Sequence, residues 1–241
     1  GDHIRLSAMD STAKGLGLGE PTGVELPESI GYRANKENKK ILHPDTPSWY
    51  QGDQILAAIG QSDNRFTPMQ LCVYATTLAN RGTRMKATFL SRVVSSDYRT
   101  LIFENKPVVA EQMNLAGTTI ESYWQGMRKV VTTPGGTADK YFGGIDDGLE
   151  GDADGVWPLR GEVIVYAKTG TAEHASGGSD HGAFVCFAHR KDETEPDIAV
   201  AVFGEKIAHG STLAVVAEQI LEAYFEIEGS SETYTYENQV G

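Results

Sequence analysis

The chain has 241 residues, of which 40% are hydrophobic and 22% charged, a composition typical of a folded protein that buries a substantial core. Its formal net charge of −12, without any cluster of Lys or Arg, argues against nucleic acid or anionic lipid as a partner. The sequence contains no run of about 18 apolar residues and no basic-then-apolar signal pattern at its N-terminus.

The N-terminal part combines two helices with a long intervening loop. Apolar residues at helical spacing predict a helix over residues 3–14, which ends in a glycine-rich stretch. Residues 20–50 are rich in Pro, Gly, Asn and Lys and are predicted to be mostly loop. A hydroxyl N-cap followed by proline opens a strong helix over residues 67–82, where a glycine stops it.

The middle of the chain is predicted to form two strands, a helix and a loop. Residues 87–95 and 100–104 have the composition of strands. A helix fits residues 119–133 and ends at a Pro-Gly-Gly sequence. The Gly- and Asp-rich residues 143–161 are predicted to be an irregular surface loop.

The last third reads as a small antiparallel sheet covered by a helix. Residues 162–172, 181–189 and 197–206 are β-branched, aromatic and Ala-rich runs separated by polar turns, which predicts three antiparallel strands. An apolar helix is predicted over residues 211–225, where it can cover one face of the sheet. The acidic tail, residues 226–241, is expected to be flexible.

The candidate site is the sequence Lys168-Thr169-Gly170-Thr171, inside the first of these strands. K-T-G in a strand is one of three signatures of penicillin-recognising serine acyltransferases, together with S-x-x-K and S-x-N. Lys168 would bring positive charge to a substrate carboxylate, and the two threonines would offer hydroxyl donors. Gly170 would let a substrate backbone pair against the strand, and a backbone N–H here would act as an oxyanion donor. Alone, the K-T-G motif is weak evidence for such a site, because the same three residues also occur where a surface lysine precedes a bend in a strand.

Further motifs occur in a fixed order around this strand, and with them the chain resembles the C-terminal part of class B penicillin-binding proteins. These are peptidoglycan D,D-transpeptidases, and the resemblance extends from about Asp2 to Phe225. The matching segments are 15–27 (GLGLGEPTGVELP), 50–53 (YQGD), 59–61 (IGQ), 66–70 (FTPMQ), 136–138 (GTA), 168–173 (KTGTAE), 181–184 (HGAF) and 209–210 (HG).

The resemblance implies a mixed α/β (α+β) fold of the serine-transpeptidase and β-lactamase type, an antiparallel sheet flanked by helices. Residues 1–225 would be the C-terminal portion of this domain. The implied reaction is serine acyl transfer that cross-links stem peptides ending in D-Ala-D-Ala, with β-lactams acylating the same serine. No metal or organic cofactor is implied.

The resemblance also implies partners and a location. The expected partners are the stem peptide, β-lactam antibiotics, the N-terminal part of the same protein and proteins of a cell-wall synthesis complex. The implied location is the outer face of a bacterial cytoplasmic membrane, through an N-terminal anchor absent from this chain.

The family places S-x-x-K and S-x-N before the GLGxxTG segment, so the nucleophile is expected N-terminal to this chain, which alone would be inactive. Two formal matches exist, Ser11 with Lys14 and Ser62 with Asn64. Lys14 runs directly into glycines, which puts Ser11 at the end of a helix, whereas the S-x-x-K serine begins a buried one. Two alternatives remain: a self-sufficient serine hydrolase that uses these four residues, and a non-catalytic module that binds peptidoglycan or a divisome partner.

Other candidate residues favour structural roles. Glu150, Asp152 and Asp154 imitate half of a calcium loop, but Gly161 stands where the bidentate acid is required. The histidines lack metal-ligand spacing, and a structural role such as donation to a backbone carbonyl is expected for those near the cleft. Core positions are expected for the two cysteines and for the aromatic pair of the 119–133 helix. These residues are His174, His181, His189, His209, Cys72, Cys186, Tyr123 and Trp124.

Overall fold

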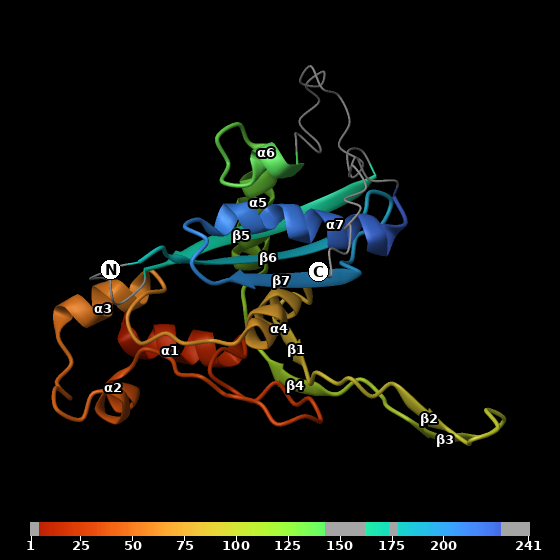
Figure 1. Ribbon diagram of the computed structural model, residues 1–241, viewed down its shortest axis with the longest axis horizontal. Coiled ribbons are helices and arrows are strands. Elements are labelled where there is room, and N and C mark those ends of the chain that lie inside the picture. Colours follow the sequence, from red (N-terminus) through yellow and green to blue (C-terminus); the bar gives the residue numbers. More distant parts are fainter. Residues whose placement is uncertain (1–4, 143–161, 174–177, 228–241) are drawn as a thin grey trace, which may run out of the picture.

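The structure is a computed structural model that describes residues 5–142, 162–173 and 178–227. At its centre lies a three-stranded antiparallel sheet in the order β5-β6-β7 (Figure 1). The strands are β5 (Val163–Ala172), β6 (His181–Arg190) and β7 (Ile198–Gly204). All three predicted strands are therefore confirmed, and their antiparallel pairing with them.

Both faces of this sheet are buried, because successive side chains of a strand point to opposite sides. On one face, residues such as Ala167 and Phe184 join a core with α7 (Ala214–Phe225) and α6 (Asp139–Phe142). On the other face, Phe187 packs against α4 and α5. The strand β6, central in the sheet, is accordingly buried along most of its length.

The two helices of the second face are those predicted with most support from the sequence. The first, α4 (Pro68–Ala79), has Thr67 as its N-cap, whose Oγ1 accepts from the backbone N–H of Gln70 at 3.2 Å. The second is α5 (Gly117–Thr132), on which Trp124 is buried and donates from Nε1 to the carbonyl of Leu78 at 3.0 Å. The prediction of a core position is confirmed for Trp124.

The same prediction is wrong for Tyr123, which is 41% exposed. Its hydroxyl lies 2.6 Å from that of Tyr74 on α4, so this residue still links the two helices. The predicted helix over 211–225 is present as a short 3-10 helix, η1 (Gly210–Leu213), that continues into α7.

The N-terminal part contains α1 (Leu6–Gly15), α2 (Lys36–Leu42) and α3 (Gln51–Ala58). The first confirms the predicted helix, but α2 shows that the prediction of loop over 20–50 is wrong in part. Two interactions stabilise α2: Asn35 caps its first turn, and the buried Lys39 pairs with Asp53 on α3 at 2.5 Å.

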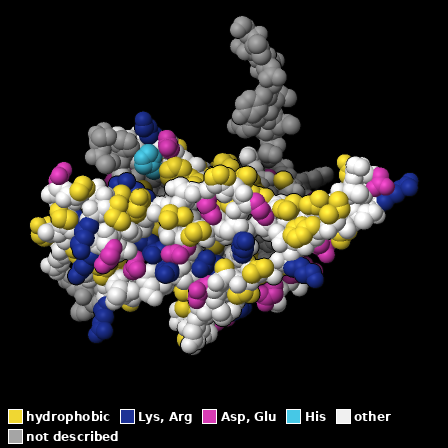
Figure 2. Space-filling view, turned by 90° about the horizontal axis from the view of Figure 1, so that it is seen from below, with side chains coloured by type: hydrophobic (Ala, Val, Ile, Leu, Met, Phe, Trp, Pro, Cys, Tyr) yellow, Lys and Arg dark blue, Asp and Glu magenta, His cyan; other side chains and the backbone are white. Residues whose placement is uncertain are grey.

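Between α4 and α5 the chain forms a long two-stranded arm (Figure 1). Near the body, β1 (Thr83–Met85) pairs with β4 (Val109–Gln112), and further out β2 (Arg92–Val94) pairs with β3 (Leu101–Glu104). The predictions at 87–95 and 100–104 are confirmed in part by β2 and β3, whereas β1 and β4 were not predicted. Figure 2 shows hydrophobic side chains gathered along this arm.

Two predictions fall on residues outside the described ones. These are the surface loop at 143–161 and nearly all of the tail from Glu226. Within the described ranges, no helix is both long and apolar enough to cross a lipid bilayer.

Candidate active site

The strand β5 lies at one edge of the sheet, and no described strand pairs with its outer edge, which we call the open edge. Two of its carbonyls accept hydrogen bonds from side chains outside the sheet: Val165 from Arg128 at 3.2 Å and Thr171 from Gln61 at 3.3 Å. The N–H and C=O of one residue point the same way in an antiparallel strand, and every second residue repeats that direction. The open edge therefore carries the backbone N–H and C=O of Thr169 and of Thr171.

The three polar side chains of the predicted site each have a hydrogen-bond partner in the structure. Lys168 is exposed, and its Nζ donates to the carbonyl of Thr169 at 2.5 Å. The hydroxyl of Thr169 lies 2.8 Å from that of Thr137, which precedes α6. The hydroxyl of Thr171 accepts from the backbone N–H of Gly210 at 3.4 Å. The strand thus presents an ammonium group and two fixed hydroxyls beside an open backbone edge.

Close backbone packing fixes one face of this strand. A Cβ on Gly210 would lie 1.9 Å from the carbonyl oxygen of Gly170, so only glycine lets η1 rest on β5. A Cβ on Gly182 would likewise lie 2.8 Å from the Cα of Gly210. Gly170 itself is not crowded, since a Cβ there would meet its nearest neighbour, on Ala183, at 3.7 Å. The prediction that Gly170 leaves room for a substrate backbone is compatible with this spacing and stays a prediction.

The structure adds three residues to the four predicted ones: Gln61, Thr137 and Gly210. Each belongs to a short motif noted in the sequence, IGQ, GTA or HG. Nothing in those motifs gave the residues a role, because their contacts with β5 join segments far apart in the chain.

The two formal catalytic matches have other surroundings. Ser11 and Lys14 are exposed on α1, a helix with no buried residue, whereas the S-x-x-K serine belongs on a buried helix. Ser62 has a left-handed backbone (φ 64°) in the turn between α3 and α4. The Asn64 side chain accepts from the backbone N–H of Ala34 at 2.9 Å. This environment supports a structural role for both matches.

Of the histidines singled out in the sequence, His181 and His189 have backbone and ring contacts. His189 is buried, with Nδ1 2.8 Å from the carbonyl of Arg190, as expected for a structural histidine. His181 opens β6, and its Nδ1 accepts from the N–H of Lys206 at 3.3 Å, so it does not donate there as predicted. His209 immediately precedes η1, and His174 lies outside the described residues.

The predicted core position is confirmed for Cys186, whereas Cys72 is only half-buried. Burial raises the pKa of the Cys186 thiol to about 12, helped by the nearby Cys72 thiol, and burial also raises the pKa of Cys72. Both are free thiols. No group of three or more potential metal ligands occurs among the described residues, and the half calcium loop at 150–161 lies outside them.

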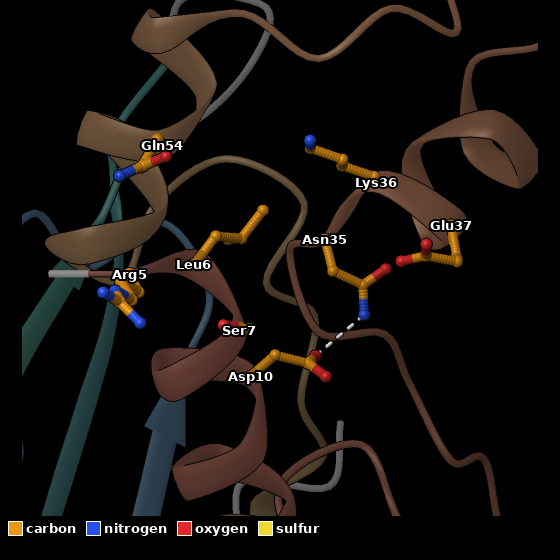
Figure 3. A pocket seen from close by; sticks show the side chains of 8 residues that line it. All are labelled: Arg5, Leu6, Ser7, Asp10, Asn35, Lys36, Glu37 and Gln54. Atoms are coloured by element: carbon orange, nitrogen blue, oxygen red, sulfur yellow. Dashed lines mark hydrogen bonds between the residues drawn. The ribbon is translucent and has the colours of Figure 1, made fainter.

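A separate pocket of about 600 Å³ lies between α1, the start of α2 and α3 (Figure 3). Asn35 and Asp10 face each other across it, joined by a hydrogen bond of 2.8 Å. None of its lining residues comes from β5, and its four charged side chains balance in sign. The lining residues are Arg5, Leu6, Ser7, Asp10, Asn35, Lys36, Glu37 and Gln54.

Residues 2–222 match the family model described as the penicillin binding protein transpeptidase domain. Over 237 residues the chain is 28% identical to the peptidoglycan D,D-transpeptidase MrdA of Acinetobacter baumannii, covering 92% of this chain and 31% of that protein. Over 234 residues it is 27% identical to penicillin-binding protein 2A of Bacillus subtilis, covering 90% and 28%.

The fold is similar to that of solved structures. Penicillin-binding protein 2B from Streptococcus pneumoniae superposes with a TM-score of 0.64 at 26% identity, covering 91% of this chain and 33% of that one. The chain therefore spans about a third of the length of the relatives that it matches.

Proposed function

This chain belongs to the penicillin-binding protein transpeptidase domain family, and from that premise we propose that it supplies the substrate strand of a peptidoglycan D,D-transpeptidase. In this reaction a serine hydroxyl attacks the carbonyl of the D-Ala-D-Ala peptide bond, the C–N bond breaks and D-Ala leaves. The acyl group then passes from the serine to the amine of a neighbouring stem peptide. The observation that carries the proposal is the open edge of β5 beside Lys168, Thr169 and Thr171.

The stem peptide would bind to this edge as an added antiparallel strand. The backbone N–H and C=O of Thr169 would pair with the peptide backbone, once the Lys168 ammonium, which donates to that C=O in the structure, turns to the substrate. The ammonium group of Lys168 would bind the terminal carboxylate, with the two threonine hydroxyls as further donors. In the tetrahedral intermediate, the N–H of Thr171 would donate to the oxyanion, where a fixed donor stabilises charge as it develops. A β-lactam, whose strained amide imitates the same peptide, would use the same groups.

We place the nucleophilic serine on polypeptide that precedes this chain, as the motif order of the family implies. Two features of the structure support a partner there. The outer edge of β7 has no paired strand among the described residues. In addition, Val216, Ile220 and Tyr224 are spaced by four residues on α7 and are 39–51% exposed, which leaves an apolar stripe on one helix face. We propose that the N-terminal part of the same protein covers both.

The proposed location and further partners follow from the substrate. Peptidoglycan lies outside the cytoplasmic membrane, so the domain would work on the outer face, held there by an anchor that precedes it. Proteins of a cell-wall synthesis complex would be its neighbours. No cofactor is needed, because serine, lysine and backbone donors suffice for acyl transfer.

The test is Lys168→Ala in the polypeptide that carries this chain together with its nucleophile. We expect acylation by a fluorescent penicillin to slow by about 10- to 100-fold, because a charged hydrogen bond contributes roughly 1.5–3 kcal/mol. Lys191→Ala removes the same charge from an exposed turn after β6 and serves as the control. Equal labelling of the Lys168 variant and the parent would contradict the role of β5, provided that both have the same circular dichroism spectrum.

A further inference from the structure

The turn between α3 and α4 reaches across the molecule to the substrate strand. Its residue Gln61 donates from Nε2 to the carbonyl of Thr171 at 3.3 Å, although the two residues are 110 positions apart in sequence. This carbonyl is on the open edge of β5, in the same residue as the proposed oxyanion donor. Gln61 therefore contacts β5 at the residue whose backbone N–H is the proposed oxyanion donor and has to point at the reacting carbonyl.

Side-chain bonds hold this turn from within. The amide of Asn64 donates to the carbonyl of Gln61 at 3.2 Å and to that of Ala57 at 3.3 Å. Its oxygen accepts from the N–H of Ala34 at 2.9 Å, which ties the turn to the segment before α2. One asparagine thus fixes the backbone of Gln61 directly.

Residues from the segment that precedes α3 also hold this turn in place. Asp63 is buried and lies 2.7 Å from Nε2 of His43. The backbones of Tyr32 and Arg65 exchange two hydrogen bonds, each of 2.8 Å. Gly31 permits this approach, since a Cβ there would lie 2.0 Å from the carbonyl oxygen of Arg65. The Ser-Asp-Asn sequence, a formal match to a catalytic motif, is in this structure the support of a rigid turn.

We infer that Gln61 is a positioning residue for acyl transfer, acting through Thr171. By holding the carbonyl of Thr171, its carboxamide restrains the backbone at this end of an edge strand, where no neighbouring strand among the described residues does so. The N–H of Thr171 then keeps a constant direction, and a donor fixed in advance stabilises an oxyanion better than a mobile one. This inference rests on the proposed function.

The decisive variant is Gln61→Glu, which keeps the size of the side chain but cannot donate while its carboxylate is ionised. In the polypeptide that carries the nucleophile, we expect the rate constant for acylation by a penicillin to fall about tenfold at pH 7, the effect of one hydrogen bond. The dissociation constant of the non-covalent complex should change less than about twofold. As the pH falls toward the ordinary carboxyl pKa of about 4.3, the protonated acid can donate, and the rate relative to the parent should recover.

Two further variants separate this role from a merely structural one. Gln61→Asn is one methylene shorter, so its donor falls short of the carbonyl, and we expect the same loss of rate without recovery at low pH. Gln125→Glu adds the same charge at an exposed position of α5 and should leave the rate unchanged. Melting temperatures and circular dichroism of all variants establish that each is folded.

The outcomes distinguish this inference from the function on which it rests. If the parent is acylated and Gln61→Glu reacts at the parental rate, or loses rate equally at every pH, the inference is overturned. If the parent itself is not acylated, the proposed function fails first. Both Gln61 variants could also melt at a lower temperature. If the smaller folded fraction then explains the whole loss of acylation rate, Gln61 has only a structural role and the inference is overturned.

Discussion

At the scale of single residues, the carboxyl group of Glu218 has a strongly raised pKa. It is buried on α7, and its Oε1 has no hydrogen-bond partner among the residues that the structure describes. Burial raises its pKa to about 8, and the neighbouring Glu222, also buried, adds to the shift. The folded protein therefore holds a proton on Glu218 that the unfolded chain releases near its ordinary pKa of 4.5.

This difference predicts how Glu218→Gln changes stability. Between about pH 4.5 and pH 8 the folded state binds more protons at this site, so the parent loses stability as the pH rises through that window. The variant has no such loss. We expect similar melting temperatures near pH 4.5 and a growing advantage for the variant, about 1–3 kcal/mol by pH 8, since an ionised buried carboxylate lacks partners.

The measurement is a series of thermal melts of both proteins from pH 4.5 to pH 8. Glu205→Gln, at an exposed position after β7, is the control and should follow the parent. A difference between the Glu218 variant and the parent that does not vary with pH would show that the carboxyl titrates normally in the folded protein.

At the scale of elements, the outer arm is the part least connected to the core. Its strands β2 and β3 pair only with each other among the described strands, and every residue of β3 is exposed. Apolar side chains on this arm are far from buried, for example Ile102 at 65% and Phe89 at 64% exposed. The arm therefore contributes little apolar burial to the stability of the sheet.

We accordingly expect that replacing residues 91–105 by an Asn-Gly turn leaves the fold intact. The ends of that segment already lie side by side, because the N–H of Asn105 donates to the carbonyl of Ser91 at 2.8 Å. A two-residue turn suits such a junction. The melting temperature should shift by less than about 2 °C, on the scale of an exposed hairpin, and light scattering should show less self-association, since exposed apolar surface is removed.

Calorimetry of the parent protein and of the variant without residues 91–105 tests this prediction. Loss of the cooperative transition in the shortened protein would contradict it and would make the arm part of the core.

The elements that the sequence predicted correctly are those with local signals. Both α4 and α5 combine an apolar periodicity with clear stops, and the three central strands are continuous apolar runs between polar turns. The helix α2 was missed because its Lys- and Asn-rich sequence reads as loop, while a capping side chain and the packing of Lys39 decide the outcome. The strands β1 and β4 were missed because each is short and exists only through pairing with the other.

The candidate site was predictable in its residue types and not in its geometry. The motif placed Lys168 and Thr171 in a strand, as observed. The sequence did not show that Gly210 rests on β5 or that Gln61 reaches it. These features arise from contacts between residues 39 to 110 positions apart, which no local pattern encodes.

At the scale of the whole molecule, the question is how the substrate strand and the nucleophile come together. We propose that a sheet buried on both faces offers one edge, β5, with the groups that would bind a stem peptide, while the reacting serine would come from polypeptide that precedes the chain. The open edge of β7 and the apolar stripe on α7 are where that polypeptide would pack. Substrate strand and nucleophile would thus meet only in the longer protein.

Intact mass spectrometry after incubation with a penicillin tests this claim most directly. The measurement compares the chain of residues 1–241 with the longer polypeptide that carries its nucleophile. The expected result is one covalent penicillin adduct on the longer polypeptide and none on the chain alone. An adduct on the chain alone, abolished by Ser11→Ala, would contradict it, as would a longer polypeptide that remains unmodified.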